Sequence, residues 1–150
     1  ARWAPSWVNY QIARYTLVDD EEIIKEIAEH GVNGFVYNID TLRTAKGVAV
    51  LSFVKGKSGT YDKEYITSKG NSWEVFDAGI ACQTFCLAAH AKGVGTCIMG
   101  VIDDKSIAKI VNLPEDETVA ALIVYGYEDG EHAAPNKRKD VDEIMRFVDR

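Results

Sequence analysis

The stretch WEVFDAGIACQTFCLAAHAKGVGTCIMG, residues 73–100, decides the fold of this chain. Residues 73–92 carry apolar side chains on nearly every face of a helix, which predicts one long helix buried at the centre of the molecule. Asn71 or Ser72 can cap the start of this helix, and Gly93 is the residue expected at its end. The rest of the chain is predicted to pack around it.

Shorter elements flank the central helix. Apolar runs of strand length predict three strands, at residues 13–18, 47–54 and 119–127, of which the last two are expected to be covered on both faces. Acidic N-caps predict two helices, one from Asp19 or Asp20 to about His30 and one from Asp103 or Asp104 to Val111. The pattern of residues 141–148 predicts a final amphipathic helix. The glycine-containing stretch 55–70 predicts a long loop or hairpin. Because strands and helices alternate, we expect a layered α/β domain.

The composition is that of one globular domain spanning residues 1–150. The chain has 47% hydrophobic residues, and its 17 Lys and Arg against 23 Asp and Glu give a formal net charge of −6. The hydrophobic content excludes intrinsic disorder. The net negative charge argues against nucleic acid as a partner, since nonspecific binding depends on clustered cations.

The three cysteines, Cys82, Cys86 and Cys97, form an odd set in a chain without an apolar run of membrane-spanning length. We therefore expect a reducing, cytoplasmic location and no membrane association. Cys82, Cys86 and His90 recur at four-residue spacing, which places them on one helix face and is compatible with metal ligation. Free cysteines are commonly buried and no C-x-x-C pair supports zinc, so packing is favoured and no metal is predicted.

Several polar or glycine-rich segments stand at the ends of the expected elements. They are the loop with Pro5, Ser6, Asn9 and Gln11, the polar turn around Asn38, the glycine turn 93–100 and the basic run Lys137-Arg138-Lys139. Amide and hydroxyl groups suit the alternating donors and acceptors of a flavin edge, and cations suit a phosphate. On their own, these segments favour a cofactor or nucleotide binder.

Three stretches carry a family resemblance. APSWVNYQ at residues 4–11 matches the pattern A-P-S-x-x-N-x-Q and so resembles the nitroreductase family. Residues 77–100 are similar to D-x-G-x-A-x-Q-x-x-x-L-A-A-x-x-x-G-x-G-x-C-x-x-G, and the 113–144 region resembles the family's tail. The order of these stretches agrees over nearly the whole chain.

The resemblance implies an α+β, three-layer α/β/α sandwich with a mostly antiparallel mixed sheet around the long buried helix. It implies an oxidoreductase that binds FMN and uses NADH or NADPH as co-substrate. Hydride would pass through flavin N5 to an electron acceptor such as a nitroaromatic or a quinone, in a two-step exchange. The cofactor would carry the chemistry, so no catalytic side chain is predicted.

The resemblance also implies a homodimer with FMN at the subunit interface. The loop bearing Pro5, Ser6 and Asn9 would come from one subunit and contact the flavin held mainly by the other. The predicted cofactor-binding residues are Pro5, Ser6, Asn9, Gln11, Asn38, Met99, Gly100, Lys137, Arg138 and Lys139, of which the last three would hold the phosphate.

One family feature has no counterpart here. Members usually begin with a helix bearing an R-R-S-x-R-like segment, whereas this sequence opens at Ala1 without a methionine. Either natural N-terminal residues are lacking, which the missing methionine favours, or this member binds flavin differently or not at all. The alternative function is therefore a flavin-binding or interaction protein without redox turnover.

Overall fold

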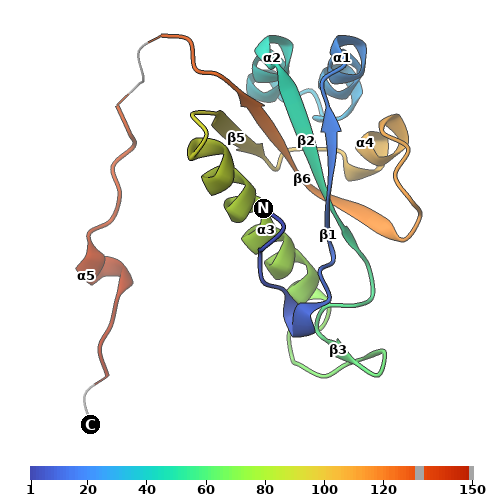
Figure 1. The fold of residues 1–150 in the computed structure, drawn as a ribbon, viewed down its shortest axis with the longest axis vertical. Helices are drawn as coiled ribbons and strands as arrows, with labels where there is room; N and C mark the ends of the chain where they lie inside the picture. The colour runs from blue at the N-terminus through green and yellow to red at the C-terminus, as the bar shows by residue number, and fades with distance from the viewer. Residues whose placement is uncertain (131–133, 149–150) are drawn as a thin grey trace.

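A four-stranded sheet forms the middle of the molecule in a computed structural model that describes residues 1–130 and 134–148. Its strands are β1 (Ala13–Val18), β2 (Gly47–Val54), β6 (Glu117–Gly126) and β5 (Gly95–Met99), in the order β1-β2-β6-β5 (Figure 1). Each neighbouring pair is antiparallel. All eight residues of the central strand β2 are buried, which confirms the prediction from its continuous apolar run.

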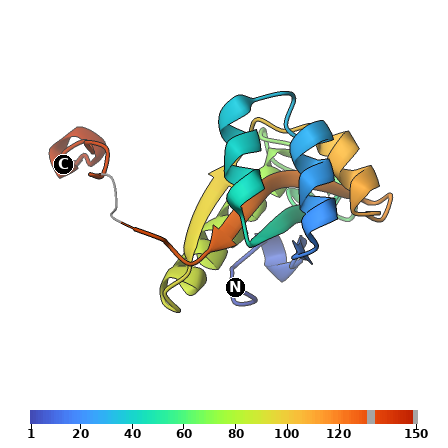
Figure 2. The same ribbon diagram turned by 90° about the horizontal axis from the view of Figure 1, so that it is seen from above.

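Helices cover both faces of this sheet. On one face lie α1 (Glu21–His30), α2 (Val36–Thr44) and α4 (Asp104–Ile110), and on the other lies α3 (Ser72–His90), as Figure 2 shows. Alternate residues of β2 divide between the two cores: Val48 and Val50 pack with α1, whereas Ala49 and Leu51 pack with α3. This arrangement confirms the predicted three-layer α+β fold, although the sheet, which was expected to be mixed, is antiparallel throughout the described residues.

The predicted N-caps of two helices are formed. The Asp20 carboxylate accepts hydrogen bonds from the backbone N–H groups of Glu22 and Ile23 at the start of α1. Asp103 does the same for Lys105 and Ser106 at the start of α4. Each carboxylate satisfies N–H groups that the helix itself leaves unpaired.

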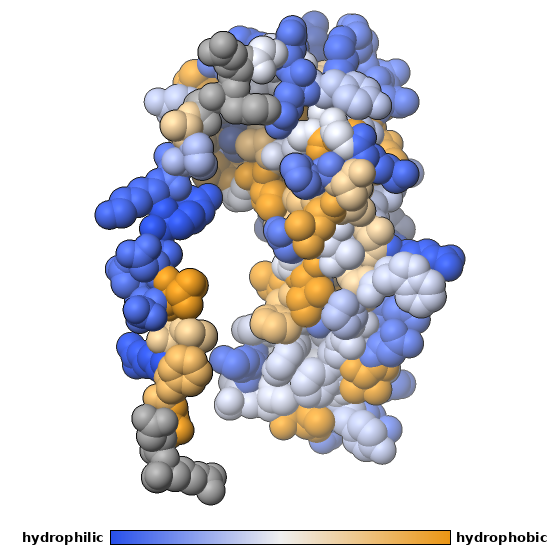
Figure 3. Space-filling view, turned by 60° about the vertical axis from the view of Figure 1, so that its left-hand side comes forward, coloured by the Kyte–Doolittle hydropathy of each residue, from blue (hydrophilic) through white to orange (hydrophobic). Residues whose placement is uncertain are grey.

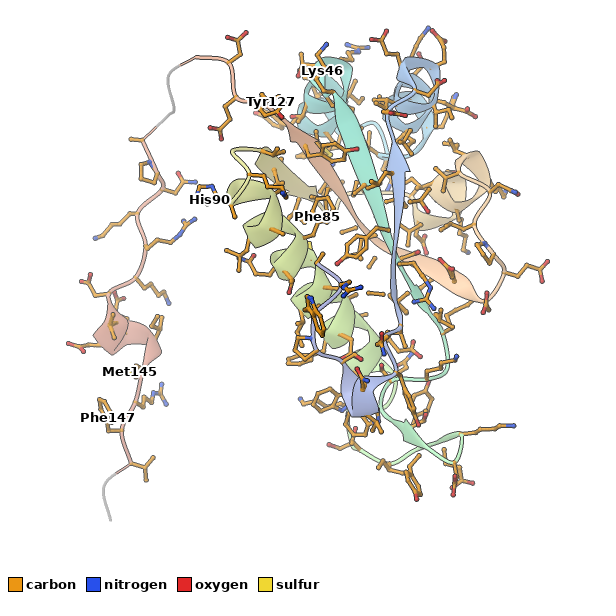
Figure 4. The ribbon with its side chains drawn as sticks, in the orientation of Figure 1. Lys46, Phe85, His90, Tyr127, Met145 and Phe147 are labelled. Atoms are coloured by element: carbon orange, nitrogen blue, oxygen red, sulfur yellow. The ribbon has the colours of Figure 1, made fainter. Side chains whose placement is uncertain are left out.

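Helix α3 is covered on one side only, whereas its apolar composition predicted burial all round. Ala78, Ala81 and Cys82 pack against the sheet, and Phe85 lies between the helix and the rings of Tyr15 and Tyr125 (Figure 4). On the opposite side, 63% of Val75, 57% of Phe76 and 59% of Leu87 are exposed. Within one chain, half of this apolar helix therefore has no cover.

Other elements differ from the sequence prediction. Helix α2 replaces the polar turn expected around Asn38; its N-cap, Phe35, makes no side-chain capping bond, so the sequence carries no start signal there. The stretch 55–70, by contrast, agrees with the predicted long loop or hairpin, because it contains the short hairpin of β3 (Thr60–Tyr61) and β4 (Glu64–Tyr65). Residues 7–9 form the single turn η1 (Trp7–Asn9).

The C-terminal segment, residues 134–148, runs away from the sheet and helices (Figures 1 and 3). Its only helix, α5 (Val141–Ile144), ends four residues before the predicted end at Val148. The apolar residues of the segment are exposed, and so short a helix is unstable without a surface to pack against. In the described part of the chain, no helix combines the length and apolar character needed to cross a membrane.

Candidate functional site

Three of the predicted site residues lie together where α2 meets the end of β5. Asn38, in the first turn of α2, is 9% exposed, and its side-chain Nδ2 donates a hydrogen bond to the Val101 carbonyl oxygen at 3.0 Å. Met99, the last residue of β5, is buried, and Gly100 follows it as an exposed residue. The amide of Asn38 therefore fixes the segment that carries Gly100.

Gly100 exposes bare backbone at this point. A Cβ atom added to it would meet no other atom of the described chain within 4 Å. Packing within this chain therefore gives no reason for a glycine there. An absent side chain does allow a flat ligand to approach the backbone N–H closely.

The second group of predicted residues forms the loop from Pro5 to Gln11. The Ser6 hydroxyl accepts a hydrogen bond from the Gln11 backbone N–H at 2.8 Å and closes the loop. Val8, Asn9 and Gln11 have φ angles of 45°, 57° and 51°, in the left-handed region. Non-glycine residues there cost roughly 1–3 kcal/mol each and persist only where surrounding contacts hold them.

Contacts around Trp7 hold this strained loop. The Trp7 backbone N–H donates to the Asp77 carboxylate, at 3.0 Å to Oδ2 and 3.2 Å to Oδ1. Its indole N–H donates to the Thr60 carbonyl oxygen at 3.0 Å, and its ring lies 4.9 Å from that of Trp73. Asp77 was not among the predicted site residues; the available signal was a carboxylate in a mostly apolar helix, where Glu74 is the other acidic residue.

A hollow of about 400 Å³ lies beside the loop, between the N-terminal segment, β1 and α3. Pro5, Ser6 and Gln11 contribute to its lining, together with Tyr15 and Phe85. The Tyr15 hydroxyl donates to the Ala81 carbonyl oxygen at 2.8 Å. Burial, followed by the neighbouring Cys82 and Cys86 thiols, raises the pKa of Tyr15 to about 12.

Lys137, Arg138 and Lys139 are exposed and lie in the C-terminal segment. The Arg138 guanidinium donates to the Asn136 carbonyl oxygen at 3.4 Å, within the same segment. One copy of the chain therefore does not bring the basic run to either of the other two groups.

The loop and the Asn38 group also lie in different layers. The loop is bonded to α3, on one face of the sheet, whereas Asn38 belongs to α2, on the other. Ten predicted residues thus form three separate groups within a single chain.

The cysteines do not form a cluster. Cys82 is buried, and desolvation, followed by the neighbouring Cys86, raises its pKa to about 11. Cys97 is exposed, and its register partner Val124 belongs to the core on the opposite side of the sheet from Cys82. Across residues 1–130 and 134–148, no group of three or more His, Cys, Asp or Glu side chains could hold a metal ion.

Comparison with known families and structures gives a consistent result. The model described as "Nitroreductase family" matches residues 1–127. MhqN of Bacillus subtilis (strain 168), which is named provisionally as an NAD(P)H nitroreductase, is 24% identical to this chain; the match covers 97% of the chain and 82% of MhqN.

Solved structures agree in fold. A nitroreductase family protein from Streptococcus pneumoniae TIGR4 superposes with a TM-score of 0.79 at 20% identity, covering 97% of this chain and 83% of that one. An FMN-dependent nitroreductase from Clostridium difficile R20291 gives a TM-score of 0.73 at 25% identity, covering 97% and 80%.

Proposed function

The chain belongs to the nitroreductase family, and from that premise we propose that residues 1–150 form a single FMN-binding domain of an NAD(P)H-dependent oxidoreductase. The observation that carries the proposal is the junction of α2 and β5, where the Asn38 amide holds the segment bearing the bare backbone of Gly100. Both residues were expected, from the resemblance, to contact the flavin ring.

The residues at this junction suit a flavin. A side-chain amide offers a second N–H and an oxygen to the pyrimidine edge of the ring. The backbone N–H of Gly100 is accessible because no Cβ stands beside it, and buried Met99 keeps that backbone in the sheet. The FMN, when bound, supplies hydride transfer between NADH or NADPH and the electron acceptor in two successive steps.

The protein's part is to bind and to orient. Asn38 and Gly100 hold the ring edge, and the loop with Pro5, Ser6, Asn9 and Gln11 closes the site from a second subunit. Lys137, Arg138 and Lys139 neutralise the phosphate, since clustered cations bind phosphate through charge-assisted hydrogen bonds. The acceptor is a small aromatic or quinonoid molecule that stacks on the ring, with nitroaromatics and quinones as the test compounds.

The separation of the three groups supports a homodimer. In one copy the loop and the Asn38 group lie in different layers, so a site built from both requires a second copy.

Two exposed apolar surfaces also need cover. The outer side of α3 forms a shallow hollow of about 520 Å³ lined by Val75, Phe76, Gly79, Ile80, Gln83 and Thr84. The C-terminal segment exposes Met145 and Phe147 away from the body of the chain (Figures 3 and 4). Apolar surfaces of this kind mark association sites, and a second copy supplies a complement to each.

The test of the function is a visible spectrum of the purified protein with added FMN, followed by anaerobic addition of NADH or NADPH. We expect a yellow complex that bleaches with at least one nucleotide and recovers its colour when a quinone is added. A protein that takes up no FMN contradicts the proposal.

A yellow protein that neither nucleotide bleaches would support the second function, flavin binding without redox turnover. The Gly100→Ala variant serves as the control, because it is expected to fold normally and to lose colour. A monomeric mass with FMN bound would contradict the shared site.

A further inference from the structure

Asp77 is a buried carboxylate that the proposed chemistry does not use. We propose that it is a positioning residue, which holds the Pro5–Gln11 loop in the strained shape that the flavin site of the partner subunit requires. This inference rests on the proposed function, in which the Pro5–Gln11 loop of one subunit completes the flavin site of the other. It identifies Asp77 as the residue that keeps this loop ordered.

The burial of Asp77 makes its hydrogen bonds essential. The side chain is 3% exposed, and its oxygens accept from the Trp7 backbone N–H and from the Ser58 hydroxyl, the latter at 2.5 Å. Among the described residues it forms no salt bridge. Because a buried charge is costly without compensation, the carboxylate holds both donors firmly in place.

The position of Trp7 in the loop is what transmits this constraint. Trp7 directly follows Ser6 and precedes Val8 and Asn9, both of which have left-handed backbone angles. Fixing its N–H therefore fixes the backbone on each side of it. Without this anchor, the loop can relax to less strained conformations, and the fraction of molecules with a binding-competent loop falls.

The same carboxylate connects the loop to the β3–β4 hairpin. Ser58 is fully buried in the segment before β3, and the Trp7 indole donates to Thr60 within that strand. The loop, the hairpin and α3 therefore meet at Asp77, so a single substitution there should loosen the loop without touching Asn38 or Gly100.

Glu74 provides a matched control. It lies one turn earlier on α3, is 5% exposed, and accepts from the Gly56 backbone N–H at 2.5 Å. Like Asp77 it anchors the segment before β3, but its bond to Gly56 does not involve the N-terminal loop. The general loss of stability caused by removing a buried carboxylate should therefore appear in the variants of both residues.

The experiment compares Asp77→Asn with Glu74→Gln by FMN titration and by hydrogen exchange of residues 5–11 without FMN. We expect both variants to lower the melting temperature. Only Asp77→Asn should speed exchange in the loop and raise the dissociation constant for FMN by about tenfold, because its amide lacks the charge and the second acceptor oxygen of the carboxylate. With saturating FMN, its kcat should recover towards the wild-type value.

Ser58→Ala keeps the carboxylate and removes one donor, so it should show the same direction of change at smaller size. If Asp77→Asn does not fold, Ser58→Ala takes its place in the comparison with Glu74→Gln. The inference is overturned if wild-type protein binds FMN while Asp77→Asn and Glu74→Gln behave alike in exchange and affinity. Accelerated loop exchange in Asp77→Asn together with a wild type that binds no FMN would instead overturn the proposed function and leave Asp77 as the anchor of the loop.

Discussion

At the scale of single residues, Gly100 is a position where a substitution should weaken cofactor binding without affecting folding. Its position has open space for a Cβ, so Gly100→Ala should leave the melting temperature nearly unchanged. The added methyl group would stand between the backbone N–H and a flat ligand, so we expect a clear loss of FMN affinity in a fluorescence titration. Equal affinity of the two proteins would show that the flavin does not approach this backbone.

Tyr15 predicts how stability depends on pH. Burial raises its pKa from 10.0 to about 12 in the folded chain, so the folded state favours the protonated phenol. This contribution is fully present below pH 10 and is lost as the pH rises from about 10 to 12. Tyr15→Phe, which also loses the bond to Ala81, should cost about 1 kcal/mol near neutral pH.

Urea unfolding at several pH values between 8 and 11.5 would measure this effect. The difference in unfolding free energy between wild type and Tyr15→Phe should shrink as the pH rises through this range. A difference that stays constant with pH would mean that the Tyr15 phenol has an ordinary pKa.

At the scale of elements, the pairing of β2 and β6 depends on a glycine facing a tyrosine. Gly47 and Tyr125 are register partners, and a Cβ at Gly47 would lie 2.4 Å from the tyrosine ring. Gly47→Ala should therefore destabilise the fold by about 1–3 kcal/mol, as overpacking does. Gly126→Ala is the control, because its Cβ would make an ordinary 3.8 Å contact with Lys46. Urea midpoints that shift equally in both variants would contradict this reading.

The basic run in the C-terminal segment should contribute to FMN affinity only through the phosphate group of FMN. Replacing Lys137, Arg138 and Lys139 with alanine should weaken FMN binding by about tenfold or more while leaving riboflavin, which lacks the phosphate, unchanged. Lys105 and Lys109 of α4 are also exposed, and their double alanine variant serves as the control. Parallel titrations with the two flavins make the comparison, and an equal loss for both would exclude a phosphate role.

At the scale of the whole molecule, the exposed side of α3 predicts association. Val75→Lys places a charge on an apolar face that is otherwise uncovered, so we expect a folded monomer that binds FMN poorly. Leu17→Lys, at an equally exposed residue of β1, should stay dimeric. Sedimentation with and without FMN measures both, and a Val75→Lys dimer would place the interface elsewhere.

The layered fold was predictable from local patterns because each pattern reflects a local cause. The continuous apolar run of β2, the capping carboxylates Asp20 and Asp103, and the glycine after α3 all act within a few residues of one another. Helix α2 was missed for the same reason, since Phe35 provides no local capping signal.

The sequence by itself determined the fold class, the family resemblance and the identity of the candidate site residues, because these depend on residue type and spacing. Only the tertiary structure decided which of those residues lie together. It joined Asn38 to the segment of Gly100 through a contact spanning 63 residues, and it anchored the N-terminal loop on Asp77, 70 residues away. The tertiary structure also exposes the outer side of α3 to solvent, whereas the apolar composition of this helix predicted full burial. Such contacts depend on how separate elements pack in space, and no local pattern encodes that packing.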